Sequence, residues 1–399
     1  MDNPTAPRRF FPPTLFLKPL PLTNVVHRDP GVRTLTPMEA VTALYSNDDH
    51  ELSAGIMASL SCAVFEGSRI KPAGWVKRCL SRVAHRALQW TTRTRRTTDH
   101  TGSVVTEFKN RLLERSGHPY ARSLLTSSNE DSTSRVEGGD PMIGPYMMLA
   151  PEIRTNCGVW DKLFLDSVQC RDVQSRIIWE TRSTYDAAKC WLDRREPVRL
   201  KAVAAGTGLS MMLVYDQLIR EGFDPDQITV RITDNETANI ARANRLLDTL
   251  AAVRRPQLGF DWRRGISAAT EDIFETGTPS DAADPERWDV VTAIGILEYF
   301  QGYSYTTTEK RLGLEAPVES VTAHDLVRRL TEMATDGARL ILNTYRDHAS
   351  TRILELFGKR FHYRGVEDLR SLLASVSFQP ALVAGSGNIY DVNVYERSR

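Results

Sequence analysis

The chain has 399 residues, of which 41% are hydrophobic, and it carries 51 Lys and Arg against 50 Asp and Glu. This length is enough for two or three domains, and the hydrophobic content supports folded cores. A nearly neutral chain has no overall field that favours nucleic acid or an anionic membrane, so nucleic acid is not the expected partner.

Signals for membranes and metals are missing from the sequence. No apolar run approaches the roughly 20 residues that span a bilayer, and prolines interrupt the amino-terminal stretch MDNPTAPRRFFPPTLFLKPLPL. The five cysteines form no CxxC pair and no Cys/His cluster with zinc spacing. We therefore expect a cytoplasmic protein that uses no metal and contacts no membrane.

The first half of the chain is predicted to be an extended arm followed by helices. Residues 1–33 are proline-rich, and Thr36, Pro37 and Glu39 have the pattern of a helix start with a capping box. Helices are expected at about residues 37–46, 50–65 and 72–90, and again within residues 159–192.

Three other segments of the first half are distinguished by their composition. Basic residues gather between Lys77 and Arg96, which at helical spacing indicates a solvated face more often than a binding surface. Residues 126–140 are polar and predict a mobile loop or a connection to a lid. The Met-rich residues 141–151 suit either core packing or an adaptable apolar wall near a pocket.

The second half opens with a strand that breaks into a glycine turn. Apolar residues predict a strand over residues 200–205, and helical spacing predicts a helix over residues 209–219. Gly206 and Gly208 lie at the join, where a ligand can approach the backbone and the new helix presents free N–H groups. A turn of this kind that binds nothing is about as common, so the glycines alone do not decide its role.

A second strand, over residues 228–232, leads to Asp234. In a Rossmann-type sheet the end of this strand lies beside the glycine turn, so a carboxylate there can accept hydrogen bonds from both ribose hydroxyls. The alternative is a helix cap, because a helical run over residues 236–250 follows and both Asp234 and Asn235 are capping residues. The two roles are compatible.

The remaining elements keep the alternation of strands and helices that is typical of a parallel sheet. We expect strands at residues 288–294 and 338–343, helices at residues 323–334 and 366–375, and a closing hairpin from residues 381–384 and 390–395.

Residues 198–399 resemble the class I S-adenosylmethionine-dependent methyltransferases. The likeness rests on AAGTG at the glycine turn, Asp234, AATEDIF at residues 268–274 and DVVTAIGILEYF at residues 289–300, in this order. The ordered set is much more specific than any one motif.

The resemblance implies an α/β fold in two domains. Residues 191–399 are expected to form a Rossmann-like seven-stranded sheet, flanked by helices, in which the last strand is inserted antiparallel. Residues 1–190 are expected to form the arm and a mainly helical cap or lid domain.

The resemblance also implies S-adenosylmethionine as co-substrate or sole substrate, and it assigns roles to particular residues. Residues expected to bind the cofactor are Ala204, Gly206, Gly208, Asp234, Asn235, Glu271, Asp272 and Gly295. Residues expected at the reacting atoms are Tyr185, Tyr299 and Asn343, with Arg182 as a further candidate for the methionine end.

Two positions depart from the family pattern. The acidic residue that usually lies four positions before the central glycine is Ala202 here, and the first glycine is replaced by Ala204. The amino group of the methionine is therefore held either by residues outside the turn or less tightly than usual.

Three functions are compatible with these features. The first is a methyltransferase that acts on a small molecule in secondary metabolism, with the helical half forming the acceptor pocket. The second is a lyase that cyclises S-adenosylmethionine, as azetidine-2-carboxylate synthases do, because Ala202 can leave the methionine amine free to attack its own γ-carbon. The third is a non-catalytic binding module. The sequence does not identify the methyl acceptor, and a homodimer is possible.

Overall fold

The computed structural model describes residues 32, 34–45, 49–67, 143–157, 167–274, 287–300, 322–351 and 362–397. The predicted helix at residues 72–90, the basic stretch and the polar segment at residues 126–140 lie outside the described residues, as does the arm apart from Val32.

Seven strands form one sheet in the order β3-β2-β1-β4-β5-β7-β6. β1 to β5 are parallel, and β7 lies between β5 and β6 and is antiparallel to both. The predicted Rossmann-like sheet of seven strands with an inserted antiparallel last strand is therefore confirmed. The strands are β1 (Val198–Ala202), β2 (Ile228–Asp234), β3 (Ile266–Thr270), β4 (Trp288–Ala293), β5 (Ala334–Asn343), β6 (Phe378–Ser386) and β7 (Asp391–Arg397).

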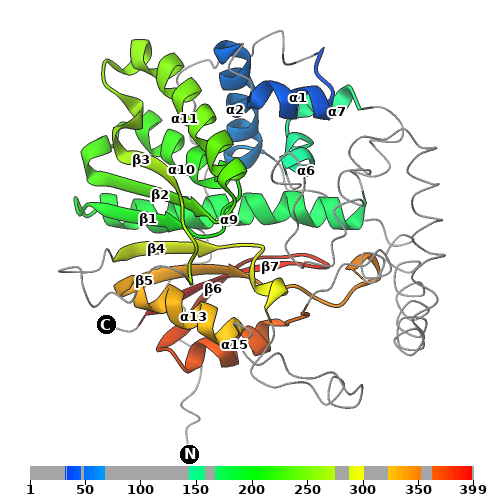
Figure 1. Ribbon diagram of the computed structural model, residues 1–399, viewed down its shortest axis with the longest axis vertical. Helices are drawn as coiled ribbons and strands as arrows, with labels where there is room; N and C mark the ends of the chain where they lie inside the picture. Colours follow the sequence, from blue (N-terminus) through cyan, green and yellow to red (C-terminus); the bar gives the residue numbers. More distant parts are fainter. Residues whose placement is uncertain are drawn as a thin grey trace, which may run out of the picture.

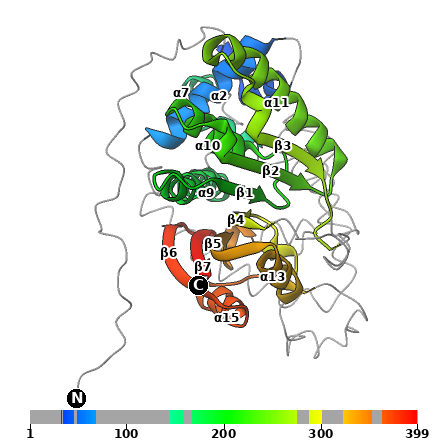
Figure 2. The ribbon, with the colours of Figure 1, turned by 90° about the vertical axis from the view of Figure 1, so that its left-hand side faces the viewer.

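Helices cover both faces of the sheet, and each covered face has its own hydrophobic core (Figures 1 and 2). Along β4, Val290 belongs to the core beneath α9, α10 and α11, while Val291 belongs to the core beneath α13 and α15. This alternation follows from the two-residue period of a strand. The larger helices are α2 (His50–Phe65), α9 (Val168–Leu192), α10 (Leu209–Arg220), α11 (Thr237–Leu258), α13 (Ala323–Glu332) and α15 (Val366–Ala374).

Short helices complete the described part of the chain. The capping box of the first is formed as predicted, because the Thr36 side chain accepts from the Glu39 N–H and the Glu39 carboxylate accepts from the Thr36 N–H. The short elements are α1 (Pro37–Leu44), α6 (Ile143–Met147), α7 (Pro151–Thr155), and the 3₁₀ turns η2 (Pro225–Gln227), η3 (Trp262–Gly265) and η5 (Leu297–Tyr299).

Several element boundaries differ from the predictions: β5 begins at Ala334, four residues before its predicted start, and β6 extends beyond residues 381–384 at both ends. β1 ends at Ala202 instead of residue 205, because Ala204 has a φ of 49° and the chain has already turned there. α11 continues to Leu258, eight residues beyond its predicted end at residue 250.

The helices of the first half pack against the helices on one face of the sheet. Figure 1 shows α2, in blue, beside α10 and α11, with α1 on the other side of α2. One hydrophobic core includes Leu44 and Ile56 together with Ile232. The predicted division at residue 190 falls within α9, two residues before its end. The division into two domains stays a prediction. Among the described residues, no helix is both long and apolar enough to cross a bilayer.

Candidate functional site

The turn after β1 has an unusual run of left-handed residues. Ala204, Gly206 and Gly208 have φ values of 49°, 58° and 68°. At Gly208 a Cβ atom would come within 2.4 Å of the buried Ile232 side chain, so only glycine fits there. The turn therefore places bare backbone at the start of α10, whose first N–H groups have no partner within the helix.

Asp234 lies beside this turn at the end of β2. One carboxylate oxygen accepts a 2.7 Å hydrogen bond from the Gly206 N–H, and the other accepts from the Glu236 N–H and the Asn239 amide. A carboxylate offers about four acceptor positions, so acceptor capacity remains after these three bonds. Burial raises the pKa of Asp234, and the three hydrogen bonds oppose this rise.

The alternative role of Asp234 as a helix cap is partly realised. The residue that caps α11 is Glu236, which makes no side-chain cap bond. Instead, the Asp234 carboxylate, two residues earlier, accepts a hydrogen bond from the Glu236 N–H. Asn235 is exposed. Asp234 therefore both fixes the start of α11 and tethers the glycine turn to β2.

The two predicted acids after β3 have different environments. The Glu271 carboxylate pairs with Lys201 at 2.5 Å and with Arg231 at 3.5 Å, so it neutralises two cations of β1 and β2. Asp272 accepts a hydrogen bond from the Phe274 N–H and so shapes its own turn. The Phe274 ring lies 5.6 Å from the ring of Phe300, which follows β4. The structure therefore brings an acid and two aromatic rings together at this edge.

A second group of polar residues lies at the ends of β4 and β5. The Gly295 N–H donates to the Asn343 side-chain oxygen at 2.7 Å, and the Asn343 amide nitrogen lies 3.1 Å from the Thr344 carbonyl and 3.5 Å from Glu298. Asn343 is 1% exposed, so these contacts account for its placement. Its amide positions Gly295 and Glu298.

Arg176 of α9 adds a buried cation to this group. One of its terminal nitrogens lies 4.0 Å from Glu298, and the other donates to the Tyr146 hydroxyl at 3.1 Å. Its guanidinium lies 4.8 Å from the centre of the Tyr390 ring, a cation–π distance. Burial raises the pKa of Glu298, and the nearby Arg176 counteracts this rise.

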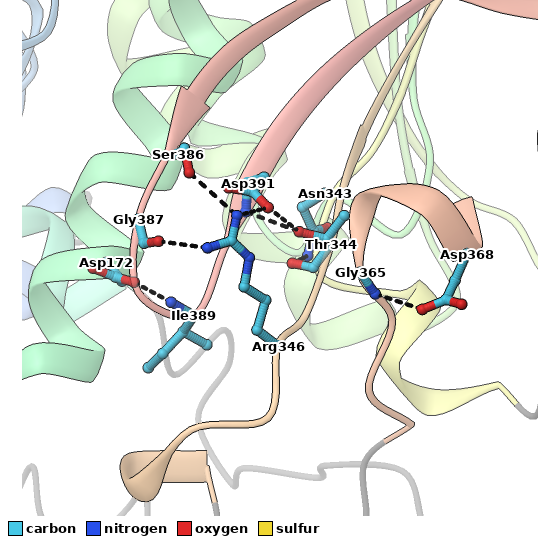
Figure 3. A network of polar contacts seen from close by, with 10 residues as sticks. All are labelled: Asp172, Asn343, Thr344, Arg346, Gly365, Asp368, Ser386, Gly387, Ile389 and Asp391. Carbon is cyan, nitrogen blue, oxygen red and sulfur yellow. Dashed lines mark hydrogen bonds and ion pairs between the residues drawn. The ribbon is translucent and has the colours of Figure 1, made fainter. Parts of the chain in front are cut away.

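The Tyr390 ring is positioned by the turn between β6 and β7, which is fixed by hydrogen bonds (Figure 3). The Ile389 N–H of this turn donates to Asp172 of α9 at 2.5 Å, and Arg346 pairs with Asp391 at the start of β7. Tyr390 also packs against Tyr345, with ring centres 5.2 Å apart. Burial raises the pKa values of both tyrosines, which therefore stay neutral phenols.

Tyr185 and Arg182 are not brought to the other predicted residues. The Tyr185 hydroxyl donates to the Glu221 carboxylate at 2.7 Å, just past the far end of α10. This end lies about 18 Å from the glycine turn, given the helical rise per residue. Arg182 donates to the carbonyls of Val64 at 2.6 Å and Gly67 at 3.3 Å, so both residues hold neighbouring helices together. Tyr299 follows β4 and is 41% exposed.

Two buried residues of α9 that face the site, Arg176 and Glu180, are not among the residues predicted from the sequence to form it. Arg176 and Glu180 lie one helical turn apart, and the Glu180 carboxylate accepts a 2.7 Å hydrogen bond from Ser210 in the first turn of α10. A basic and an acidic residue four apart commonly form an exposed pair, so only their burial marks them.

Solved structures with a similar fold are methyltransferases. The chain is 14% identical to the CurJ carbon methyltransferase over 92% of this chain and 100% of that one, with a TM-score of 0.42. It is 17% identical to magnesium protoporphyrin IX methyltransferase from Synechocystis PCC 6803 with bound SAH, over 57% and 87%, with a TM-score of 0.36. An O-methyltransferase from neocarzinostatin biosynthesis, in complex with SAH and 1,4-dihydroxy-2-naphthoic acid, is 14% identical over 70% and 67%, with a TM-score of 0.34.

No protein-family model matches the chain, and no curated protein matches it. The similar structures differ from this chain at more than four in five aligned positions, so their ligands describe those proteins alone.

Proposed function

We propose that the protein is an S-adenosylmethionine-dependent methyltransferase that acts on a small molecule. The observation that carries this proposal is the contact between Asp234 and the Gly206 N–H at the carboxyl edge of the sheet. It joins an acid with remaining acceptor capacity to a turn of bare backbone, which is the combination that a nucleoside with a charged tail requires.

Each part of the site has a place in this proposal. Asp234 receives the ribose hydroxyls, with Asn235 beside it, and the turn from Ala204 to Gly208 lies along the methionine chain of the co-substrate. Asp272 faces the adenine, with the Phe274 and Phe300 rings as its apolar neighbours, while Glu271 neutralises the cations beneath. Gly295 lies at the end of β4, where Asn343 fixes it.

Methyl transfer from adenosylmethionine requires little acid–base catalysis by the protein. Adenosylmethionine supplies an electrophilic methyl carbon, so the chain must align an acceptor with it and exclude water. Tyr345, just after β5, and Tyr390, just before β7, give an aromatic wall at the edge of the sheet where Tyr299 is exposed. Asn343 acts here by positioning Gly295 and Glu298.

The first test is the affinity for adenosylhomocysteine, measured by calorimetry. Asp234→Ala should weaken binding by about 1.5–3 kcal/mol, the range for hydrogen bonds to a charged group. Asp336→Ala is the matched control. Asp336 is a 72% exposed acid near the start of β5, at the edge of the sheet opposite to Asp234. Equal affinity of the wild type and Asp234→Ala would contradict the cofactor assignment.

Ala202 favours a second candidate, the cyclising lyase. It is 1% exposed at the end of β1, where the resemblance leads us to expect an acid that holds the methionine amine. The nucleoside product separates the two reactions. Methyl transfer yields adenosylhomocysteine and requires an acceptor, whereas cyclisation releases methylthioadenosine from adenosylmethionine alone. If the wild type releases methylthioadenosine without an acceptor, at a rate well above the spontaneous one, and Asp234→Ala does not, the lyase replaces the methyltransferase as the proposed function.

A further inference from the structure

The glycine turn is held from two directions. From the sheet, the Asp234 carboxylate accepts a hydrogen bond from the Gly206 N–H. From the helices of the first half, the Tyr45 hydroxyl donates a 2.8 Å hydrogen bond to the Thr207 hydroxyl, across 162 residues of sequence. Tyr45 directly follows the last residue of α1. The turn therefore has one anchor in the sheet and a second anchor outside it.

The second anchor is buried and firmly mounted. Thr207 is fully buried and Tyr45 is 9% exposed, so water does not compete for their hydrogen bond. The α1 helix that carries Tyr45 is itself fixed to α2, because the Ser53 hydroxyl donates to the Ala43 carbonyl at 2.7 Å. A change at Thr207 is therefore transmitted to a packed helix rather than to a loose side chain.

The backbone of the turn needs such an anchor. Gly206 and Gly208 both have positive φ values, and glycine has more conformational freedom to lose on ordering than any other residue. Gly208 also caps α10, and as a glycine it offers no side-chain bond to the first turn of that helix. Thr207 lies between the two glycines, so a bond to its side chain restricts the backbone on either side. The N–H groups that the turn presents to a ligand thus depend on Tyr45 for their positions.

We propose that Tyr45 is a positioning residue for the nucleoside site, and that it acts through Thr207 by fixing the glycine turn in the conformation that binds the ligand. This inference rests on the proposed function. The coupling is reciprocal, so a ligand that requires the ordered turn must also strengthen the packing of α1. A bond with a structural role alone would stabilise the fold and leave the affinity for the ligand unchanged.

Calorimetry with adenosylhomocysteine tests the role of Tyr45, under conditions in which circular dichroism shows every variant to be folded. Tyr45→Phe removes only the hydroxyl and should weaken binding by about 3- to 10-fold, the effect of one lost hydrogen bond between neutral groups. Thr207→Val should weaken binding by a similar factor, and Thr207→Ser should bind more tightly than Thr207→Val because it keeps the hydroxyl. Tyr45→Phe/Thr207→Val should lose no more than either single variant, since the same bond is lost in all three.

Tyr215→Phe is the matched control. Tyr215 is a fully buried tyrosine of α10 whose hydroxyl donates to the Trp262 carbonyl at 2.9 Å, just before β3 and at the opposite edge of the sheet from the glycine turn. The chemical change is the same as in Tyr45→Phe, so Tyr215→Phe should lower the stability of the fold and leave the affinity for adenosylhomocysteine unchanged.

Hydrogen exchange measures the reciprocal effect. Adenosylhomocysteine should slow amide exchange in α1 of the wild type and should slow it less in Tyr45→Phe. If Tyr45→Phe does not fold, Thr207→Val takes its place in both measurements. Unchanged affinity in these variants, an equal loss in Tyr215→Phe, or exchange in α1 that does not respond to the ligand would overturn the role of Tyr45 and leave the proposed function standing. A wild type that does not bind adenosylhomocysteine would overturn both.

Discussion

At the scale of single residues, the glycine turn contains one side chain that its backbone does not favour. Ala204 has a φ of 49°, in the left-handed region that costs a residue with a Cβ atom about 1–2 kcal/mol. Its neighbour Ala205 does not have a positive φ. Ala204 thus occupies a position where glycine would adopt the same backbone conformation with less strain.

Ala204→Gly should therefore stabilise the protein by about 0.5–1 kcal/mol, because relief of the left-handed strain exceeds the entropy that glycine loses on folding. Ala205→Gly is the matched control and should destabilise by a similar amount. Denaturant unfolding of both variants measures the difference. A destabilised Ala204→Gly would mean that the Ala204 methyl makes packing contacts worth more than the strain.

At the scale of elements, the end of β5 is clasped to the turn between β6 and β7. Arg346 donates to the Gly387 carbonyl at 3.1 Å and to the Ser386 hydroxyl at 3.2 Å, and it pairs with Asp391 (Figure 3). Asp391 is fully buried and also accepts from the Thr344 hydroxyl at 3.0 Å. The clasp holds the turn that carries Tyr390, so it shapes one wall of the site.

Arg346→Met should destabilise the protein by about 2–3 kcal/mol, because it leaves the buried Asp391 carboxylate without its cation. In Arg346→Met/Asp391→Asn the loss should be smaller than the sum of the two single losses, as for groups that share one network. Arg370→Met is the control, since Arg370 forms an exposed pair with Glu367 and should change stability by less than about 0.5 kcal/mol. Additive losses, measured by denaturant unfolding, would show that the pair is not coupled.

At the scale of the whole molecule, the described helices of the first half share a core with the sheet. The α2 helix is tied to α10 by Arg220 and Ser61, to α11 by His50 and Thr249, and to α9 by Arg182. The Tyr45 hydroxyl donates to Thr207 of the glycine turn at 2.8 Å, with both residues buried. Folding of the helical half therefore supports the turn directly.

Leu60→Ala in α2 should lower the free energy of unfolding of the entire protein by about 2–5 kcal/mol, the usual cost of emptying a buried leucine site. Leu60 is 1% exposed, whereas Leu382 in the edge strand β6 is 51% exposed, so Leu382→Ala is the control. Circular dichroism and tryptophan fluorescence should report a single coincident transition. An early separate transition in Leu60→Ala would show that the helical half unfolds independently.

The sequence by itself determined the fold and the glycine turn, because both follow from patterns among residues that are close together in the chain. Strand and helix periods, Gly206, Gly208 and Asp234 are local signals, and the order of the elements leaves few arrangements of the sheet. Only the tertiary structure decided which side chains surround the site. Tyr185 and Arg176 lie nine residues apart on one helix, yet only Arg176 faces the ends of the strands, because α9 crosses the sheet and its direction depends on packing against α6, α10 and β4. Arg176 and Glu180 have the spacing of an ordinary exposed helical pair, but in the folded protein both charges are buried. The spacing in the sequence does not reveal this burial.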